Sequence, residues 1–195
     1  MSIQTRKERE RAERERLIVT AARELAESEG WDAVTTRRLA AEIEYSQPVL
    51  YSHFKGKDAI MAAVAVQGCA DLADELHRAR TAARGRRAAL AAVGETYTAF
   101  ARRRPALYDA MFTHRVDLPF ATPEAPEPLQ RAFAELLAAV EPIAAEGDDP
   151  GLLTETYWAG LHGLVTLMRS GRLPEGAHER RLDLLTGHFT AGADS

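Results

Sequence analysis

The stretch from Thr35 to Asp58 constrains the fold of this chain more than any other segment. Two short helical patterns lie within it, and a tight turn of three residues, 44–46, separates them. Each pattern keeps its apolar side chains on one face. These residues are Leu39, Ala40 and Ile43 in the first pattern and Leu50 and Phe54 in the second. The segment therefore predicts two short helices that pack on a shared core and meet at a sharp turn.

The second pattern has a distinctive outer face. Gln47, Tyr51 and Ser52 point away from the apolar side, and the pattern contains no acidic residue. A helix with one face on a core and the other in a DNA major groove has this character. Thr35 or Thr36 can cap the first helix. Ser46 can cap the second, where Pro48 falls in the first turn.

Helical periodicity continues through almost the whole chain, and no segment alternates as a strand would. Apolar residues from Leu17 to Ala26 predict a first helix that ends at Gly30. Gly56 is expected to end the third helix. Further helices are predicted at 58–82, 86–103, 105–113, 126–145, 151–170 and 178–190, with glycines and prolines at the breaks. The predicted fold class is all-α.

Composition suits a soluble globular protein, since 46% of the 195 residues are apolar and 28% are charged. No apolar run reaches membrane-spanning length, and the N-terminus begins with a charged tract unlike a secretory signal. Cys69 is the single cysteine, so an internal disulfide is impossible. These features favour the cytoplasm.

The net charge of −4 argues mildly against a nucleic-acid partner, but the charge is unevenly distributed. Residues 1–60 carry 11 Lys/Arg and 11 Asp/Glu, so the excess of acid lies entirely in residues 61–195. DNA binding would therefore depend on where side chains are placed more than on bulk charge. The charged run from Arg6 to Arg16 has two interpretations: a basic arm that follows the minor groove, or a solvated helix start, which its equal acids favour.

Residues 14–62 resemble the tetracycline-repressor (TetR) family of bacterial regulators. Two matching runs are Thr35-Thr36-Arg37-Arg38-Leu39-Ala40 and Gln47-Pro48-Val49-Leu50-Tyr51-Ser52-His53-Phe54-Lys55-Gly56-Lys57. The Leu-Tyr-x-His-Phe core and the lysine three residues later are the best marks. More weakly, residues 158–164 resemble the Trp-His-Gly signature of one TetR subgroup.

The turn departs from the family pattern. The family usually has Gly-hydrophobic-Ser, and this chain has Glu44-Tyr45-Ser46. Without that glycine, either the turn uses ordinary dihedral angles or Glu44 takes a strained one.

The resemblance implies a division into an N-terminal three-helix helix-turn-helix DNA-binding domain, residues 1–60, and a C-terminal helical domain, residues 61–195, for ligand binding and dimerisation. Its function would be that of a ligand-responsive, sequence-specific transcriptional regulator, most commonly a repressor. A small hydrophobic or amphipathic effector would release it from a pseudo-palindromic operator in double-stranded DNA.

Base contacts are expected from the start of the recognition helix. Gln47 can pair with adenine, and Pro48 and Tyr51 offer apolar contact to thymine methyl groups. Arg37 could reach a guanine or a phosphate. The phosphate contacts are expected from Thr36, Ser46, His53 and Lys57, and the resemblance adds Val49 and Ser52 to the DNA-binding set. Tyr51 and His53 could instead be packing residues, and Arg38 is expected to be plain surface.

The C-terminal half contains two helices suited to a homodimer interface. Trp158, Leu161, Val165 and Met168 form one stripe, and Leu182, Leu185 and Phe189 form another. Two such helices per subunit can build a four-helix interface. A dimer would read two half-sites, which one short helix cannot do alone.

An effector pocket would lie among the central helices. Its predicted lining is Tyr97, Phe100, Tyr108, Met111, Phe112, Phe133, Trp158 and His162. Mostly apolar walls suit a hydrophobic or amphipathic ligand. Core packing explains each of these residues equally well, and a satisfied buried histidine is the favoured interpretation of His162.

The alternative is a small all-α enzyme or a metal-binding helical bundle. A di-iron bundle needs two Glu-x-x-His elements on facing helices, and the chain has only Glu175 to His178, beside Pro174 and Gly176. There is no nucleophile elbow and no phosphate-binding glycine loop. The sequence therefore predicts neither an enzyme nor a cofactor.

Overall fold

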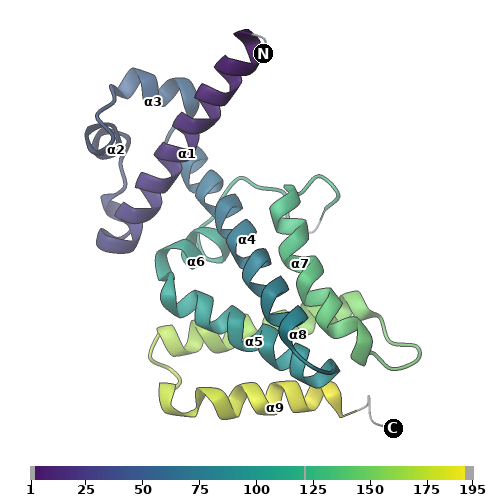
Figure 1. Ribbon diagram of the computed structural model, residues 1–195. Helices are drawn as coiled ribbons and strands as arrows, with labels where there is room; N and C mark the ends of the chain where they lie inside the picture. The colour runs from purple at the N-terminus through teal and green to yellow at the C-terminus, as the bar shows by residue number, and fades with distance from the viewer. Residues whose placement is uncertain (1–2, 121, 192–195) are drawn as a thin grey trace. The chain divides into compact units, whose positions relative to one another are not determined.

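The computed structural model describes residues 3–120 and 122–191, and every regular element in this part of the chain is a helix (Figure 1). Contacts divide the described residues into two compact units. The first unit is drawn from residues 1–68 and 104–126, and the second from 69–103 and 127–195. The prediction of an all-α fold is confirmed.

The first unit is built around the helix α1 (Ile3–Glu29). The elements that complete it are η1 (Trp31–Ala33), α2 (Thr36–Glu42), α3 (Gln47–His53), the start of α4 (Lys57–Ala82), and α6 (Pro105–Phe112). Contacts join α1 to η1, α2, α3 and α6. Thus α6, which is far from the first three helices in sequence, belongs to the same unit as they do.

The second unit contains the remainder of α4 and six further elements that follow it in the chain. These are α5 (Arg86–Arg103), α7 (Glu127–Val140), α8 (Pro150–Arg169), η3 (Glu175–Ala177) and α9 (His178–Thr190), with η2 (Glu141–Ile143) after α7. Helix α5 packs against α7, α8 and α9 and is the centre of this unit. The functional boundary expected at residue 60 stays a prediction.

The observed helix limits lie close to the predicted ones, with two instructive differences. The helix predicted at 126–145 ends at Val140, because Pro142 has no N–H to continue an α-helix, and a short 3₁₀ turn follows. The third helix ends at His53 and not at Gly56, since Phe54 takes an extended conformation. Gly56, with φ 124°, lies in the short connection to α4.

The core of the first unit follows the apolar stripe of α1. Ile18 and Ala22 are fully buried, and Gly30 ends the helix with φ 83°, a conformation that costs glycine little. Trp31 lies beyond it in η1, is buried, and donates its indole N–H to the Ala106 carbonyl oxygen at 2.8 Å. Glu27 accepts the N–H groups of Ala106 and Leu107 at 3.2 and 2.9 Å, so its carboxylate caps α6.

The core of the second unit is mainly aliphatic and also contains the buried aromatic side chains of Tyr97, Phe100 and Tyr157. Phe100 is fully buried, and the hydroxyl of the buried Tyr157 donates to the Leu90 carbonyl oxygen at 3.0 Å. A Cβ at Gly94 would lie 2.5 Å from that hydroxyl, so the close approach of α5 and α8 requires a glycine there. Burial raises the pKa of Tyr157 to about 12, and the phenol is neutral at physiological pH.

Cys69 is buried, and burial raises the pKa of its thiol to about 12. A thiol in this state behaves as a small apolar side chain. Among the described helices, none combines the length and the apolar character needed to cross a membrane.

Candidate functional site

Helices α2 and α3 pack together across the connection 43–46. Thr35 is the cap of α2, and its hydroxyl accepts the N–H of Arg38 at 3.1 Å, which decides between the two threonines considered. Ser46 stands at the cap position of α3, but its side chain makes no capping hydrogen bond. Leu39 and Leu50 are fully buried between the helices, as predicted.

The strained alternative holds for the turn. Glu44 has φ 57°, and it is the only residue other than glycine with a positive φ within the described chain. The backbone bond from the Tyr45 N–H to the Ala40 carbonyl oxygen, at 2.8 Å, closes the turn around it. A left-handed conformation costs a residue with a Cβ about 1–2 kcal/mol, so the packing of α2 against α3 must hold Glu44 in place.

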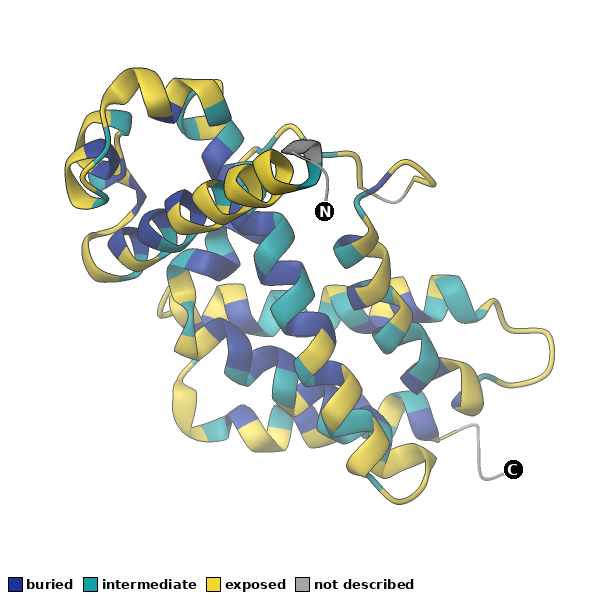
Figure 2. Cartoon of the chain, turned by 45° about the horizontal axis from the view of Figure 1, so that its top comes forward, coloured by how far each residue is buried: buried dark blue, intermediate teal, exposed yellow. Residues whose placement is uncertain are grey.

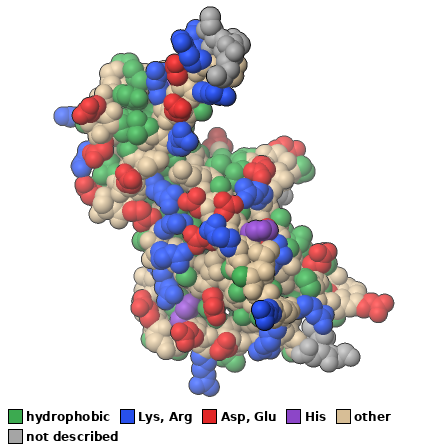
Figure 3. Space-filling view, viewed as in Figure 1, with side chains coloured by type: hydrophobic (Ala, Val, Ile, Leu, Met, Phe, Trp, Pro, Cys, Tyr) green, Lys and Arg blue, Asp and Glu red, His purple; other side chains and the backbone are tan. Residues whose placement is uncertain are grey.

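The outer face of α3 is exposed along its whole length. Its exposed residues are Gln47, Pro48, Val49, Tyr51 and Ser52. Figure 3 shows hydrophobic side chains gathered over α3, with charged groups at the margins. Tyr51 is 52% exposed, and its hydroxyl lies 3.3 Å from the Thr36 hydroxyl, which links the outer faces of α2 and α3.

Two arginines of α2 differ in their surroundings. Arg38 pairs with Glu29 at 2.8 Å and with Glu42 at 3.9 Å, which agrees with its expected place on the plain surface. Arg37 is exposed beside it.

Two of the expected phosphate contacts are engaged inside the protein. The side chain of His53 is only 6% exposed, and its Nδ1 lies 3.3 Å from Glu15 Oε1. This is the packing alternative considered for that residue. Lys57 stands at the start of α4 and donates to the Trp31 carbonyl oxygen. An ammonium group has three donors, so this bond leaves capacity for a second partner.

The residues expected to line an effector pocket divide between the units. Five belong to the second unit: Tyr97, Phe100, Phe133, Trp158 and His162. The remaining three belong to the first: Tyr108, Met111 and Phe112. Of the eight, Tyr97, Phe100, Tyr108 and Met111 are buried, and the other four are half-buried. The core-packing alternative therefore fits the buried four directly.

Within the second unit, one polar contact joins this set. The indole N–H of Trp158 donates to the Tyr97 hydroxyl at 2.9 Å, bringing α8 and α5 together. His162 lies one turn further along α8, and burial lowers the pKa of its imidazole. The neutral ring offers both a donor and an acceptor.

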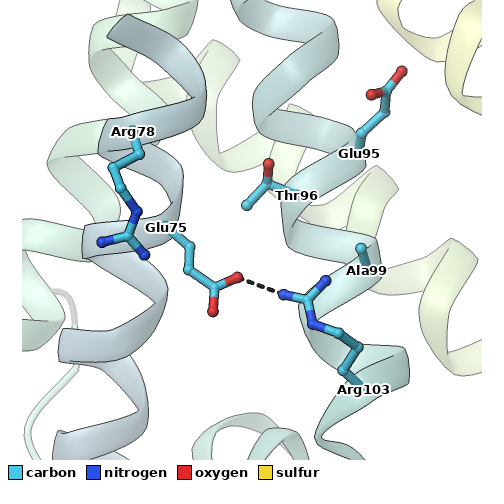
Figure 4. A pocket seen from close by; sticks show the side chains of 6 residues that line it. All are labelled: Glu75, Arg78, Glu95, Thr96, Ala99 and Arg103. Carbon is cyan, nitrogen blue, oxygen red and sulfur yellow. Dashed lines mark hydrogen bonds and ion pairs between the residues drawn. The ribbon is translucent and has the colours of Figure 1, made fainter. Parts of the chain in front are cut away.

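A different hollow, of about 500 Å³, lies between α4 and α5 in the second unit (Figure 4). Its lining residues are Glu75, Arg78, Glu95, Thr96, Ala99 and Arg103, none of them in the predicted set. Arg103 donates to Glu75 at 2.5 Å, so part of the wall charge is already neutralised. This charged surface does not match the expected hydrophobic effector.

Several contacts of the first unit were not foreseen. Glu15 holds His53 across 38 positions of sequence, and Trp31 anchors α6 across 75. No periodicity or motif links such distant residues. Among the described residues, no group of three or more His, Cys, Asp or Glu side chains could hold a metal ion.

Two models of known protein families together match most of the chain. Residues 18–64 match the model described as bacterial regulatory proteins of the tetR family. Residues 90–189 match the tetracyclin repressor-like C-terminal domain. The likeness of residues 158–164 to a Trp-His-Gly subgroup stays a prediction.

Individual proteins and solved structures are also similar to this chain. An uncharacterized HTH-type transcriptional regulator of Mycobacterium tuberculosis, Rv0681, is 29% identical over 154 residues, 79% of this chain and 69% of that protein. A solved Rhodococcus sp. RHA1 protein of unknown function has a TM-score of 0.76 at 24% identity, covering 92% of this chain and 94% of that one. A TetR variant of Acinetobacter baumannii AYE, solved in complex with minocycline, has a TM-score of 0.61 at 23% identity, covering 91% of this chain and 97% of that one.

Because both solved structures are less than 25% identical to this chain, they show a shared fold and no more. The two family matches establish the family to which the chain belongs. Regulators of this family bind DNA operators and small-molecule effectors. The chain belongs to the TetR family: it is a DNA-binding transcriptional regulator and not an enzyme.

Proposed function

We propose that the outer face of α3 reads base edges in the major groove of a pseudo-palindromic operator. The observation that supports this most is the continuous exposed face of α3, which has amide, hydroxyl and aromatic groups and no acid. Its inner face is anchored by the fully buried Leu50. Such a helix can enter a groove without moving the core beneath it.

Individual roles follow from side-chain chemistry. Gln47, at the start of α3, pairs with adenine, while Pro48, Val49 and Tyr51 contact thymine methyl groups and sugar edges. Arg37 reaches a guanine or a phosphate from the start of α2. The proposed phosphate contacts are Thr36, Ser46, Ser52, His53 and Lys57. Of these, His53 makes the weakest case, because its side chain is nearly buried beside Glu15.

We also propose that the regulator acts as a cytoplasmic homodimer through α8 and α9. Most of the two predicted stripes cannot form the interface, because four of their residues are buried inside the subunit: Leu161, Val165, Met168 and Leu182. Leu152 on α8 and Leu184 on α9 are 62% and 67% exposed, and a second subunit that covered them would remove apolar surface from water. Gly163 on α8 has open space where a Cβ would be, so a second helix could approach closely there. Two subunits would present two copies of α3 to adjacent half-sites.

Sedimentation equilibrium of Leu184→Glu tests the dimer. The charge should weaken self-association at least tenfold, whereas Leu17→Glu on α1, where the leucine is 44% exposed, should leave it unchanged. Equal effects of the two substitutions would rule out α9 as the interface.

The effector is proposed to be hydrophobic or amphipathic and to release the operator, so that the protein acts as a repressor. Support comes from the aromatic character of Trp158 and Tyr97 and from the neutral imidazole of His162. Binding must favour a dimer whose recognition helices no longer fit adjacent grooves. Trp158→Phe and His162→Gln should raise the effector concentration needed for release without changing operator affinity.

Retention of sheared genomic DNA from the source organism tests the function as a whole. The purified protein is incubated with the DNA, and the bound fragments are sequenced. The expected result is a small set of fragments that share a pseudo-palindrome, absent when Gln47→Ala with Tyr51→Ala is used. Fragments with no shared sequence would contradict base reading by α3.

A further inference from the structure

The N-terminal half of α1 is an exposed helical extension. The family match begins at residue 18, whereas α1 begins at Ile3. Figure 2 shows the extension exposed and the rest of α1 buried along one face, beside α2 and α3. Because residues 5–16 are helical, they are not an extended arm of the kind that follows a minor groove.

One face of this extension continues the buried stripe of α1. The positions of this row, at alternating spacings of four and three, are Lys7, Arg11, Arg14, Ile18, Ala21 and Leu25. At about 100° per residue, the six positions fall within a sector of about 80°. The last three are buried and the first three are exposed. The face therefore changes from apolar to basic at the point where the core ends.

Lys7, Arg11 and Arg14 form what we call the basic stripe. No acid occupies this row, but Glu10 and Glu15 flank it on its two sides, and Glu8 lies further round the helix. The stripe extends about 10 Å along the helix axis at 1.5 Å per residue. Phosphates of one DNA strand follow one another every ~3.4 Å of helix axis, so three long side chains in one row can reach different phosphates.

A shared carboxylate fixes the position of the stripe relative to α3. Arg11 donates its Nε–H to Glu15 Oε1 at 2.9 Å, and the same oxygen lies 3.3 Å from His53 Nδ1. His53 is the last residue of α3. The stripe therefore begins at the C-terminal end of the proposed recognition helix, and α1 continues past that end (Figure 1).

We propose that the basic stripe binds the DNA phosphate backbone next to the half-site that α3 reads. The inference rests on the proposed function, because that function brings DNA to the outer face of α3. Exposed Lys and Arg side chains on a helix surface suit phosphate oxygens and carry no base information. The stripe would thus strengthen binding to all DNA sequences alike and hold α1 against the phosphate backbone of the DNA. Acids beside it limit the attraction to groups that approach this row closely.

Salt dependence of binding tests the stripe, because each phosphate contact contributes about 0.9 to the slope of log K against log salt. The stripe variant is Lys7→Gln, Arg11→Gln, Arg14→Gln. The matched control, Arg6→Gln, Arg9→Gln, Arg16→Gln, removes the same charge from other faces of the same helix. Glutamine forms helices well, so α1 should persist, which circular dichroism verifies. Binding is measured by fluorescence anisotropy between roughly 50 and 200 mM salt.

Three contacts per subunit, or six per dimer, predict that the stripe variant loses about five units of slope. Across the salt range, the wild type should lose about a thousandfold more affinity than the stripe variant does. The control should stay within about one unit of the wild type. Equal slopes for the stripe variant and the control would overturn the inference, and an acidic protein partner would then be the next occupant to test.

The failure of this inference and the failure of the proposed function are distinguishable. Each variant is titrated with the fragment retained from genomic DNA and with a scrambled duplex of equal length. If the wild type prefers neither duplex, base reading by α3 is wrong, and the slopes on the scrambled duplex still decide the role of the stripe. If the preference is intact and the slopes are equal, only the stripe is wrong.

Discussion

The turn between α2 and α3 stores strain that a single substitution should release. Glu44 has φ 57°, which a residue with a Cβ adopts at a cost of about 1–2 kcal/mol. Glycine adopts this angle freely, but it is more flexible in the unfolded chain, and this offsets about 0.5–1 kcal/mol. Glu44→Gly should therefore raise the free energy of unfolding by about 0.5–1 kcal/mol.

Glu42→Gly is the matched control, because it makes the same chemical change two residues earlier. Glu42 is the last residue of α2, where glycine is about 1 kcal/mol worse than alanine. Its ion pair with Arg38 is long, at 3.9 Å, and exposed, so its loss adds little. The two substitutions should move stability in opposite directions, with a difference of about 1.5–2 kcal/mol.

Thermal and urea unfolding at one fixed protein concentration measure this difference, because dimerisation makes stability depend on concentration. For a chain of this size, the two variants should differ by roughly 3–8 °C in Tm. Operator affinity of Glu44→Gly should stay within about twofold of the wild type, since the bond from Tyr45 to Ala40 still closes the turn. Equal destabilisation by the two glycines would refute the strain at Glu44.

Three further outcomes follow from the core. Gly94→Ala should destabilise the protein by about 1–3 kcal/mol, because its Cβ would collide with the Tyr157 hydroxyl, and chemical denaturation checks this. The thiol of Cys69 is buried and has a pKa of about 12, so it should not react with an aromatic disulfide reagent at pH 8 until urea unfolds the chain. The reaction is followed by the absorbance of the thiolate that the reagent releases. Burial and nearby arginines lower the pKa of His178 below its ordinary 6.5, so its contribution to stability is complete above pH 6.5 and is lost as pH falls. Denaturant midpoints from pH 7 to 5 should decline less in His178→Gln than in the wild type.

Local signals in the sequence predict most of this fold. Gly30 ends α1 and Pro105 starts α6 because each acts through its own backbone, without help from distant residues. The same reasoning applied to Pro142 would have shortened the predicted helix at 126–145 to its observed end. The outer face of α3 also follows from spacing alone, since the buried position of Leu50 fixes which side chains are exposed.

Contacts between distant positions are harder to foresee. The burial of His53 depends on Glu15, and nothing in the spacing of either residue identifies its partner. For the turn, the sequence allowed either ordinary dihedral angles or a strained Glu44. Only the packing of α2 on α3 determines that Glu44 bears the strain. Aromatic residues in an all-helical unit fill either a core or a pocket. For Phe100, fully buried within the second unit, sequence spacing cannot distinguish between these roles.

The ratio of operator affinity to non-specific affinity tests the central claim most directly. It is measured at one salt concentration for the wild type and for Gln47→Ala, with the retained genomic fragment and a scrambled duplex. A bidentate contact to a base contributes about 1–3 kcal/mol of discrimination, so the ratio should fall roughly 5- to 150-fold while non-specific affinity stays constant. An unchanged ratio, or an equal fall in both affinities, would contradict base reading by the outer face of α3.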